Sequence, residues 1–433
     1  MSSIQAIKSI IPLLTSRGIG LLLQLILMIV LGRLLGAEGM GLYALYLSGM
    51  MTLASIADLG TPNHVLRNVS VLEDRGHVYS AVNFTLNILK MLLVPGLIMV
   101  ITAYFFSWLY LQFADPLTFD LLWLIGFSAL SAVSFIWVRV LSEALKGLGQ
   151  VNFALIAETS LLPLGALIVV AVLYRFDWDI TAESYLVLHL VLLIMVTAVM
   201  LRKLMMQYRI DQESLQTHEA TPATFNRSQL SFWGAGLLNM WFLNMPVILL
   251  PFFATTQEIG IFSVAYRLIA LASIVLVTLA SLFAPRFARD YANRDADALA
   301  SGLKQSQFLS VLVFLPMLLA FTIFSDQILG VFGDEFIAGK DLLMIMVVGQ
   351  LLNAATGLVG FMMNMIHQEK TEFHIQLFTT MLLMFLIYLL GSFYGVYGVA
   401  ISYALAIVIK NLASLYFSLY HINAMKRLAG ATQ

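Results

Sequence analysis

The sequence contains no cysteine and very little charge. The absence of cysteine excludes disulfides, thiol catalysis and metal sites with cysteine ligands. Charged residues make up 11% of the 433 residues, against about 25% in a typical soluble domain. The formal net charge is −1, which gives no reason to expect nucleic acid as a partner.

The common signatures of catalysis are also missing. No P-loop motif occurs, so we expect that the chain does not itself hydrolyse ATP. The seven histidines are scattered, and none shows the spacing of a metal site within an apolar run. These absences predict a protein that is not an enzyme and that carries no cofactor.

Most of the sequence is apolar. Hydrophobic residues make up 61% of the chain, and the mean hydropathy is +0.92. A bilayer core about 30 Å thick needs roughly 20 apolar residues for each helix that crosses it. We therefore predict an all-α integral membrane protein of about 12 transmembrane helices, near 10–33, 40–63, 82–110, 118–142, 152–174, 183–205, 229–253, 258–284, 305–325, 339–365, 373–392 and 395–420.

The positions of lysine and arginine predict the orientation of these helices. If the N-terminus is cytoplasmic, most Lys and Arg residues flank the cytoplasmic side, and only Arg33, Arg175 and Lys340 fall on the other. Cytoplasmic loops of membrane proteins carry this excess of positive charge. Both termini are therefore expected in the cytoplasm.

The chain also shows a weak internal repeat. A polar segment at 207–227 separates an N-terminal six-helix half, 1–206, from a C-terminal six-helix half, 228–433. A shift of 219 positions places the triplet Gly41, Leu42, Tyr43 on the triplet Gly260, Ile261, Phe262. Two pseudo-symmetric halves around a central cleft are typical of transporters built from parallel repeats. The alternative is that glycine–aromatic pairs recur by chance.

Charged residues inside the predicted spans suggest an anionic cargo. Charges in membrane helices are rare and usually face the bundle interior. Most of those found here are basic, and a cationic cavity suits a phosphate group, which Arg and Lys bind well. The residues concerned are Arg17, Asp58, Lys90, Arg139, Glu143, Glu158, Arg267 and Lys410.

Several of these charges also have a local explanation. Arg139 and Glu143 stand four residues apart on one helix, where they can pair with each other. Asp58 lies near a helix end, where a carboxylate can cap a turn or bind a neighbouring arginine. Lys90, Lys410 and Arg17 can extend toward the headgroups.

Polar residues within two spans are consistent with a wet interior. Gln350 and Asn353 fall on one face of the span near 339–365, and Asn244 falls in the span near 229–253. The alternative is that these amides act only as contacts between packed helices.

One stretch carries a more specific pattern. Residues 31–67 read LGRLLGAEGMGLYALYLSGMMTLASIADLGTPNHVLR. This stretch resembles the first two helices of the Wzx-type polysaccharide and O-antigen flippases, in the polysaccharide transporter branch of the multidrug/oligosaccharidyl-lipid/polysaccharide exporter superfamily. The resemblance is specific at the glycine-leucine-tyrosine triplet and at Ala57-Asp58-Leu59-Gly60 followed by Arg67. Elsewhere it rests on topology.

The resemblance implies a function. Such a protein translocates an undecaprenyl-diphosphate-linked oligosaccharide, an O-antigen or other surface-polysaccharide repeat unit, across the bacterial inner membrane by alternating access. A glycan polymerase and a chain-length regulator are the implied partners, besides membrane lipids. We predict that the cargo head is bound by Arg17, Lys90, Arg267, Lys410, Asn244, Gln350 and Asn353. Asp58 and Glu158 are the candidate sites for coupling to H⁺ or Na⁺.

Three other functions fit parts of the pattern. A small-molecule or drug exporter of the related multidrug branch would need an acidic residue for an organic cation, which the basic excess disfavours. A membrane enzyme of glycan assembly, such as a polymerase, would need catalytic charges in an outer loop, for which only Arg175, Asp177, Asp179, Glu183 and the stretch 326–340 are available. A scaffold of the assembly machinery is the third alternative.

Overall fold

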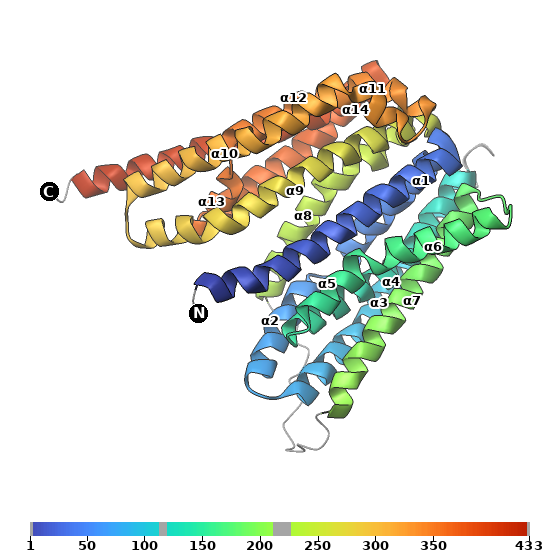
Figure 1. The fold of residues 1–433 in the computed structure, drawn as a ribbon, viewed down its shortest axis with the longest axis horizontal. Coiled ribbons are helices and arrows are strands. Elements are labelled where there is room, and N and C mark those ends of the chain that lie inside the picture. Colours follow the sequence, from blue (N-terminus) through green and yellow to red (C-terminus); the bar gives the residue numbers. More distant parts are fainter. Residues whose placement is uncertain (1–2, 112–118, 211–226, 431–433) are drawn as a thin grey trace. The chain divides into compact units, whose positions relative to one another are not determined.

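The structure is a computed structural model that describes residues 3–111, 119–210 and 227–430. Within these ranges the side chains of residues 3–17, 106–107, 110–111, 119–122, 208–210, 227–232, 272–275, 277–278 and 428–430 lie outside the description. The described residues form helices and no strand (Figure 1). The predicted all-α class is therefore confirmed.

The described residues form fourteen α-helices and two short 3₁₀ helices. Their bounds are α1 (Ser3–Ala57), α2 (Thr61–Asp74), α3 (Val78–Leu111), α4 (Phe119–Gly147), α5 (Val151–Thr159), α6 (Leu161–Arg175), α7 (Ala182–Ile210), α8 (Arg227–Leu249), η3 (Leu250–Phe252), α9 (Thr256–Ala292), α10 (Ala296–Ile323), α11 (Ser325–Gly330), η4 (Asp334–Gly339), α12 (Lys340–Thr356), α13 (Val359–Met365) and α14 (Glu369–Gly430).

Most of these helices are long and apolar. Among the described residues, eight helices could cross a membrane by length and composition, and the bent pair α5–α6 adds a ninth. Two of the eight, α1 and α14, are each divided by a glycine with positive φ: Gly36 at 65° and Gly395 at 56°. Glycine adopts this conformation without the steric cost that a side chain would bring. Each of these helices therefore consists of two rods.

The first compact unit consists of residues Met1–Leu35 and Leu42–Met240. Its six apolar rods are the two parts of α1, then α3, α4, the pair α5–α6, and α7. Helix α4 is the central element, because it packs against α2, α3, α5 and α7 (Figure 1). The core around it contains fully buried residues such as Tyr46 and Leu141.

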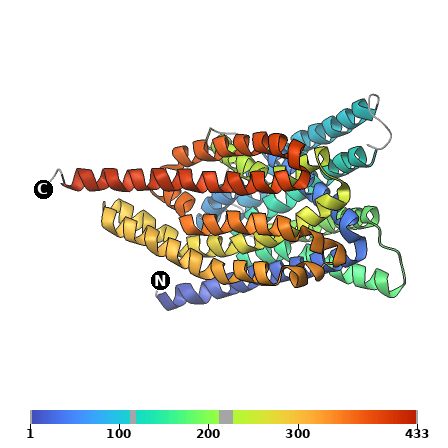
Figure 2. The same ribbon diagram turned by 90° about the horizontal axis from the view of Figure 1, so that it is seen from above.

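The second compact unit consists of residues Gly36–Gly41 and Trp241–Gln433. Its six rods are the part of α8 from Trp241 on, α9, α10, the pair α12–α13, and the two parts of α14. Helix α12 packs against α9, α10 and α14. The two parts of α14 fold back on each other, since Ser414 on the second donates a hydrogen bond to Glu372 on the first at 2.7 Å. Figure 2 shows the part of α14 that leads to the C-terminus in red.

The described residues thus contain the predicted two six-helix halves. The contact boundary between the units falls inside α8, after Met240. Residues 211–226 of the predicted linker at 207–227 lie outside the described residues. The division into 1–206, 207–227 and 228–433 therefore stays a prediction.

Gly41 and Gly260 form a close helix crossing within the second unit. A Cβ atom on Gly41 would collide with the carbonyl oxygen of Thr256, and one on Gly260 would collide with that of Ala37. Thr256 lies four residues before Gly260, and Ala37 lies four residues before Gly41. Each glycine therefore packs against the backbone one turn before the other glycine. These are the two glycines that the predicted repeat aligns. Only glycine lets the two backbones approach this closely.

Glu335 caps the rod of α1 that begins after Gly36. Its Oε2 accepts a hydrogen bond from the backbone N–H of Ala37 at 3.1 Å, within the second unit. We expect Glu335→Ala to lower the free energy of unfolding by about 0.5–1 kcal/mol, the usual contribution of such a cap. Thermal denaturation of the purified protein would measure the change. Glu335→Gln should retain most of the effect, because its amide oxygen still accepts the bond. An equal loss in Asp334→Ala would contradict a specific cap.

Candidate substrate and ion sites

A charge network lies at one end of the first unit, beginning at Asp58. This carboxylate follows α1 and is 5% exposed. Its Oδ2 accepts a hydrogen bond from Arg139 Nη1 at 2.8 Å, and its Oδ1 accepts one from the backbone N–H of Gly60 at 2.9 Å. Leu59 and Gly60 both have positive φ, at 49° and 71°. Asp58 therefore stabilises the tight turn between α1 and α2 while it pairs with α4.

Lys146 binds two of the other carboxylates that the sequence places inside predicted spans of this unit. Its Nζ lies 2.9 Å from Glu143 Oε1 on α4 and 2.9 Å from Glu158 Oε2 on α5. Ser142 also donates a hydrogen bond to Glu158 at 2.5 Å. Glu158 is therefore held by a hydroxyl and an ammonium group from one helix.

The predicted pair between Arg139 and Glu143 is wrong. Arg139 binds Asp58, and Glu143 binds Lys146. The physical reason is the burial of Asp58, because a buried carboxylate is costly unless a cation neutralises it. The turn after α1 brings that carboxylate to the face of α4 that carries Arg139.

One predicted substrate residue of the first unit, Lys90, stands outside this network. Lys90 is exposed on α3, in a row with exposed Leu93, Val94 and Leu97. It makes no ion pair with a described residue. The side chain of Arg17 lies outside the described residues.

In the second unit, Lys410 lies near one aromatic ring and one carboxylate. Its Nζ lies 5.5 Å from the centroid of the Phe242 ring, the arrangement of a cation–π contact. Glu372 acts on Lys410 electrostatically. The same carboxylate is fixed by the hydroxyl of Ser414. A Cβ on Gly360 would lie only 2.9 Å from Glu372 Oε1, so glycine leaves room for this carboxylate.

The predicted amides lie close to two buried tyrosines. Asn353 donates to Gln350 at 2.8 Å, and both are buried. The side chain of Gln350 hydrogen-bonds with Tyr403. The Tyr403 ring packs edge-on against Tyr266 at 4.9 Å and lies 6.1 Å from Phe242. Lys410 and the two amides are therefore connected through aromatic side chains.

Asn244 and Arg267 lie beside this cluster. Asn244 is 8% exposed and follows Leu243, whose carbonyl accepts a hydrogen bond from the Tyr266 hydroxyl at 2.8 Å. Arg267 is the next residue on α9 and is partly exposed. Of the predicted substrate residues, Lys410, Gln350 and Asn353 therefore come together on α12 and α14, and Asn244 and Arg267 are sequence neighbours of residues in contact with this cluster.

Sequence reasoning did not select Glu372, Tyr266 or Tyr403. Glu372 precedes the predicted start of its span by one residue, where a charge normally reaches the headgroups. Tyrosines in membrane spans are usually counted as packing residues. In the first unit, buried His189 was likewise treated as scattered, although its Nδ1 lies 2.9 Å from the Tyr46 hydroxyl. The sequence does carry a signal for His189, because an ionisable residue in the middle of an apolar run often marks a functional site.

These groups can bind a polar, negatively charged molecule. The second unit presents an ammonium group, two amides and tyrosine hydroxyls, which are hydrogen-bond donors for phosphate or sugar oxygens. Among the described residues, no group of three His, Cys, Asp or Glu residues is placed to hold a metal ion.

The fold is shared with solved membrane transporters. A multidrug resistance MATE family transporter of the MOP superfamily, solved in an inward-facing conformation, superposes with a TM-score of 0.71 at 16% identity, covering 94% of this chain and 96% of that one. A MOP superfamily transporter from Pyrococcus furiosus superposes with a TM-score of 0.64 at 16% identity, covering 97% and 96%. That transporter is described as having a binding pocket of reverse polarity, which suggests a different function for it.

The chain belongs to the polysaccharide biosynthesis protein family, whose model matches residues 6–290. A curated relative is the probable low-salt glycan biosynthesis flippase Agl15 from Haloferax volcanii, 23% identical over 196 residues. That alignment covers 45% of this chain, and the chain spans 41% of the length of this relative. The predicted family is therefore confirmed.

Proposed function

We propose that this protein is a flippase for an undecaprenyl-diphosphate-linked oligosaccharide, such as an O-antigen or other surface-polysaccharide repeat unit. It moves the cargo from the cytoplasmic to the outer leaflet of the bacterial inner membrane, with both of its termini in the cytoplasm. The observation that carries the proposal is the match of residues 6–290 to the polysaccharide biosynthesis family. The cation, amides and hydroxyls gathered around Lys410 support it, because they suit a sugar diphosphate.

The proposed binding mode assigns a task to each kind of side chain. Lys410 binds the diphosphate as a compact charge, and Arg17, Lys90 and Arg267 add further positive charge. Gln350, Asn353 and Asn244 bind sugar hydroxyls, which need both donors and acceptors. The lipid tail stays in the bilayer while the head passes through a cationic cavity by alternating access.

Ion coupling is proposed at Asp58 and Glu158. Both carboxylates are held by basic groups, Asp58 by Arg139 and Glu158 by Lys146. A proton or Na⁺ that drives transport would therefore have to compete with these cations. A glycan polymerase and a chain-length regulator are the proposed protein partners on the outer side.

The test is complementation of a deletion strain. We expect the deletion to lose surface glycan and to retain lipid-linked repeat units on the cytoplasmic side, and the wild-type gene to restore export. Lys410→Ala should lower export about tenfold or more, because a hydrogen bond to a charged group contributes about 1.5–3 kcal/mol. Lys410→Arg should restore part of it. The double variant Arg17→Ala/Arg267→Ala should also fail, whereas Lys340→Ala, an exposed residue paired with Asp326, should export normally.

Other results of this experiment would indicate a different function or exclude the proposed binding mode. Unchanged surface glycan in the deletion strain, together with lost efflux of a small dye, would indicate a drug exporter. Repeat units that reach the outer leaflet but remain unpolymerised would indicate an enzyme of glycan assembly. Normal export by Lys410→Ala and by the double arginine variant would exclude the proposed binding of the diphosphate.

A further inference from the structure

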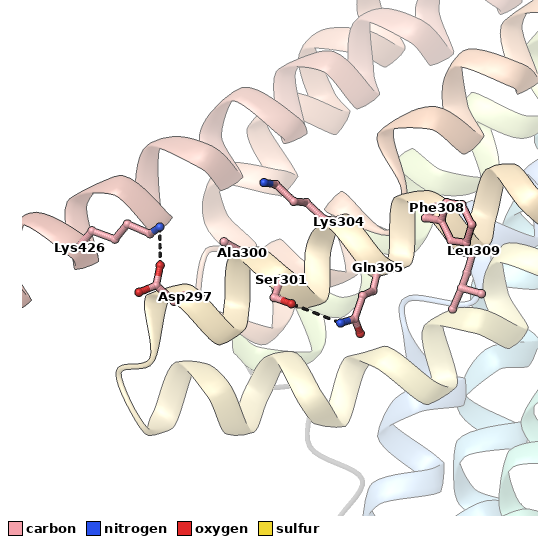
Figure 3. A pocket seen from close by; sticks show the side chains of 8 residues that line it. All are labelled: Asp297, Ala300, Ser301, Lys304, Gln305, Phe308, Leu309 and Lys426. Carbon is pink, nitrogen blue, oxygen red and sulfur yellow. Dashed lines mark hydrogen bonds and ion pairs between the residues drawn. The ribbon is translucent and has the colours of Figure 1, made fainter.

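A groove lies at the polar end of α10, within the second unit and apart from the cluster around Lys410. Its volume is about 660 Å³, and it is lined by α10 and by Lys426 of α14. Figure 3 shows its side chains, with Lys304 and Gln305 between Asp297 and Phe308. The proposed flippase function assigns no role to any of these residues.

The groove has an excess of basic groups. Lys426 Nζ lies 2.6 Å from Asp297 Oδ1, with the two side chains 44% and 87% exposed. A pair so exposed is weak, so Lys426 can exchange this partner for another anion. Lys304 is exposed and makes no ion pair with a described residue. Arg286 borders the groove, because its Nη1 donates to Gln305 at 2.6 Å, and its own charge is paired with Asp290, whose Oδ2 lies 3.6 Å from its Nε.

An apolar stripe continues from the basic end of this helix. Phe308 is 67% exposed, and Leu312, Leu315 and Leu319 are 55%, 40% and 47% exposed. With Lys304 they follow spacings of four, four, three and four residues, which place them on one face of α10. The basic end of this face can bind the phosphate of a lipid. The exposed apolar stripe beyond it can then pack against the acyl chain of the same lipid.

We propose that this groove binds an anionic phospholipid of the cytoplasmic leaflet. Its phosphate lies between Lys304 and Lys426, Gln305 and Ser301 bind headgroup oxygens, and one acyl chain lies along Phe308 and Leu312. The predicted orientation puts this end of α10 at the cytoplasmic surface, where anionic lipids are concentrated and attract basic residues. A bulk phospholipid is the occupant that the site favours, because Lys304, Lys426 and Asp297 together carry one net positive charge, which matches the single charge of a phosphodiester. The proposal does not depend on the cargo.

Native mass spectrometry of the full-length protein, titrated in detergent with phosphatidylglycerol, tests the proposal. We expect one phosphatidylglycerol to bind in preference to phosphatidylcholine of the same chains. Lys304→Ala should weaken its binding about fivefold, and Lys304→Ala/Lys426→Ala about 25-fold, following the contribution of each basic residue near an anionic surface. Lys304→Arg/Lys426→Arg should bind as the wild type does, and Lys340→Ala, at the start of α12, serves as the matched control.

Four results would overturn the proposal. These are equal binding of the two lipids, an equal loss in Lys340→Ala, unchanged binding by the double alanine variant, and loss of binding in the double arginine variant. Stronger competition by undecaprenyl diphosphate than by phosphatidylglycerol would assign the groove to the cargo lipid instead. Glycan export by the double alanine variant is a separate readout, so failure of the proposed flippase function would be recognised independently.

Discussion

Replacing Gly41 or Gly260 by alanine is expected to prevent the second unit from packing correctly. The added methyl group would coincide with a backbone carbonyl oxygen of the crossing rod, that of Thr256 or Ala37. A side chain could rotate away from such a collision, but a helix backbone cannot, so the two rods must separate. We expect a loss of more than about 3 kcal/mol, which exceeds the usual range of about 1–3 kcal/mol for overpacking. Such a loss is a large part of the stability of most proteins.

The measurement is the yield of folded protein after extraction and its melting temperature. Gly236→Ala is the matched control, because a Cβ at Gly236 on α8 has no neighbour within 4 Å. The double variant Gly41→Ala/Gly260→Ala should cost less than the sum of the single changes, since both act on one crossing. Melting of both single variants within a degree or two of the wild type would show that the crossing is not tight.

Asp58→Ala is expected to destabilise the first unit by about 2–3 kcal/mol. Removal of one partner of a buried ion pair commonly costs about 3–5 kcal/mol, because it leaves an uncompensated charge. The Arg139 side chain is 26% exposed, so water offsets part of this loss. The backbone N–H of Gly60 also loses its acceptor, which loosens the turn before α2.

A double-mutant cycle separates these contributions. Arg139→Ala in the background of Asp58→Ala should restore part of the stability, with a coupling of about 1–2 kcal/mol. Asp58→Asn retains an acceptor for Gly60 but loses the charge, so it isolates the ion pair from the turn. Denaturation of the four proteins would give the coupling, and strictly additive changes would argue against a stabilising pair.

The same variants test ion coupling. If Asp58→Asn folds and reaches the membrane but no longer exports glycan, Asp58 has a role in transport beyond the turn. Normal export by this variant would restrict Asp58 to a structural role. Glu158→Gln provides the parallel test for the second carboxylate, because its amide can still accept a hydrogen bond from Ser142 and Lys146.

Several features of the fold were determined by local sequence patterns alone. Apolar runs of about 20 residues predicted the rods, because a bilayer core admits only segments of that length. The short gaps between predicted spans also located the breaks near Gly36 and Gly395, where α1 and α14 divide. The pattern at 31–67 predicted the family that the match to residues 6–290 established. Each of these signals is contained in neighbouring residues.

The partners of charged and polar side chains were decided only by the tertiary structure. Arg139 binds Asp58, 81 positions away, and not its helical neighbour Glu143, because the turn at Gly60 brings a buried carboxylate to α4. The interaction of Glu372 with Lys410 and the contact of Gln350 with Tyr403 likewise join distant rods. The repeat predicted that Gly41 and Gly260 are equivalent, but only the structure shows that they touch. Helical periodicity determines which face a residue occupies, whereas the packing of helices far apart in the chain determines what that face meets.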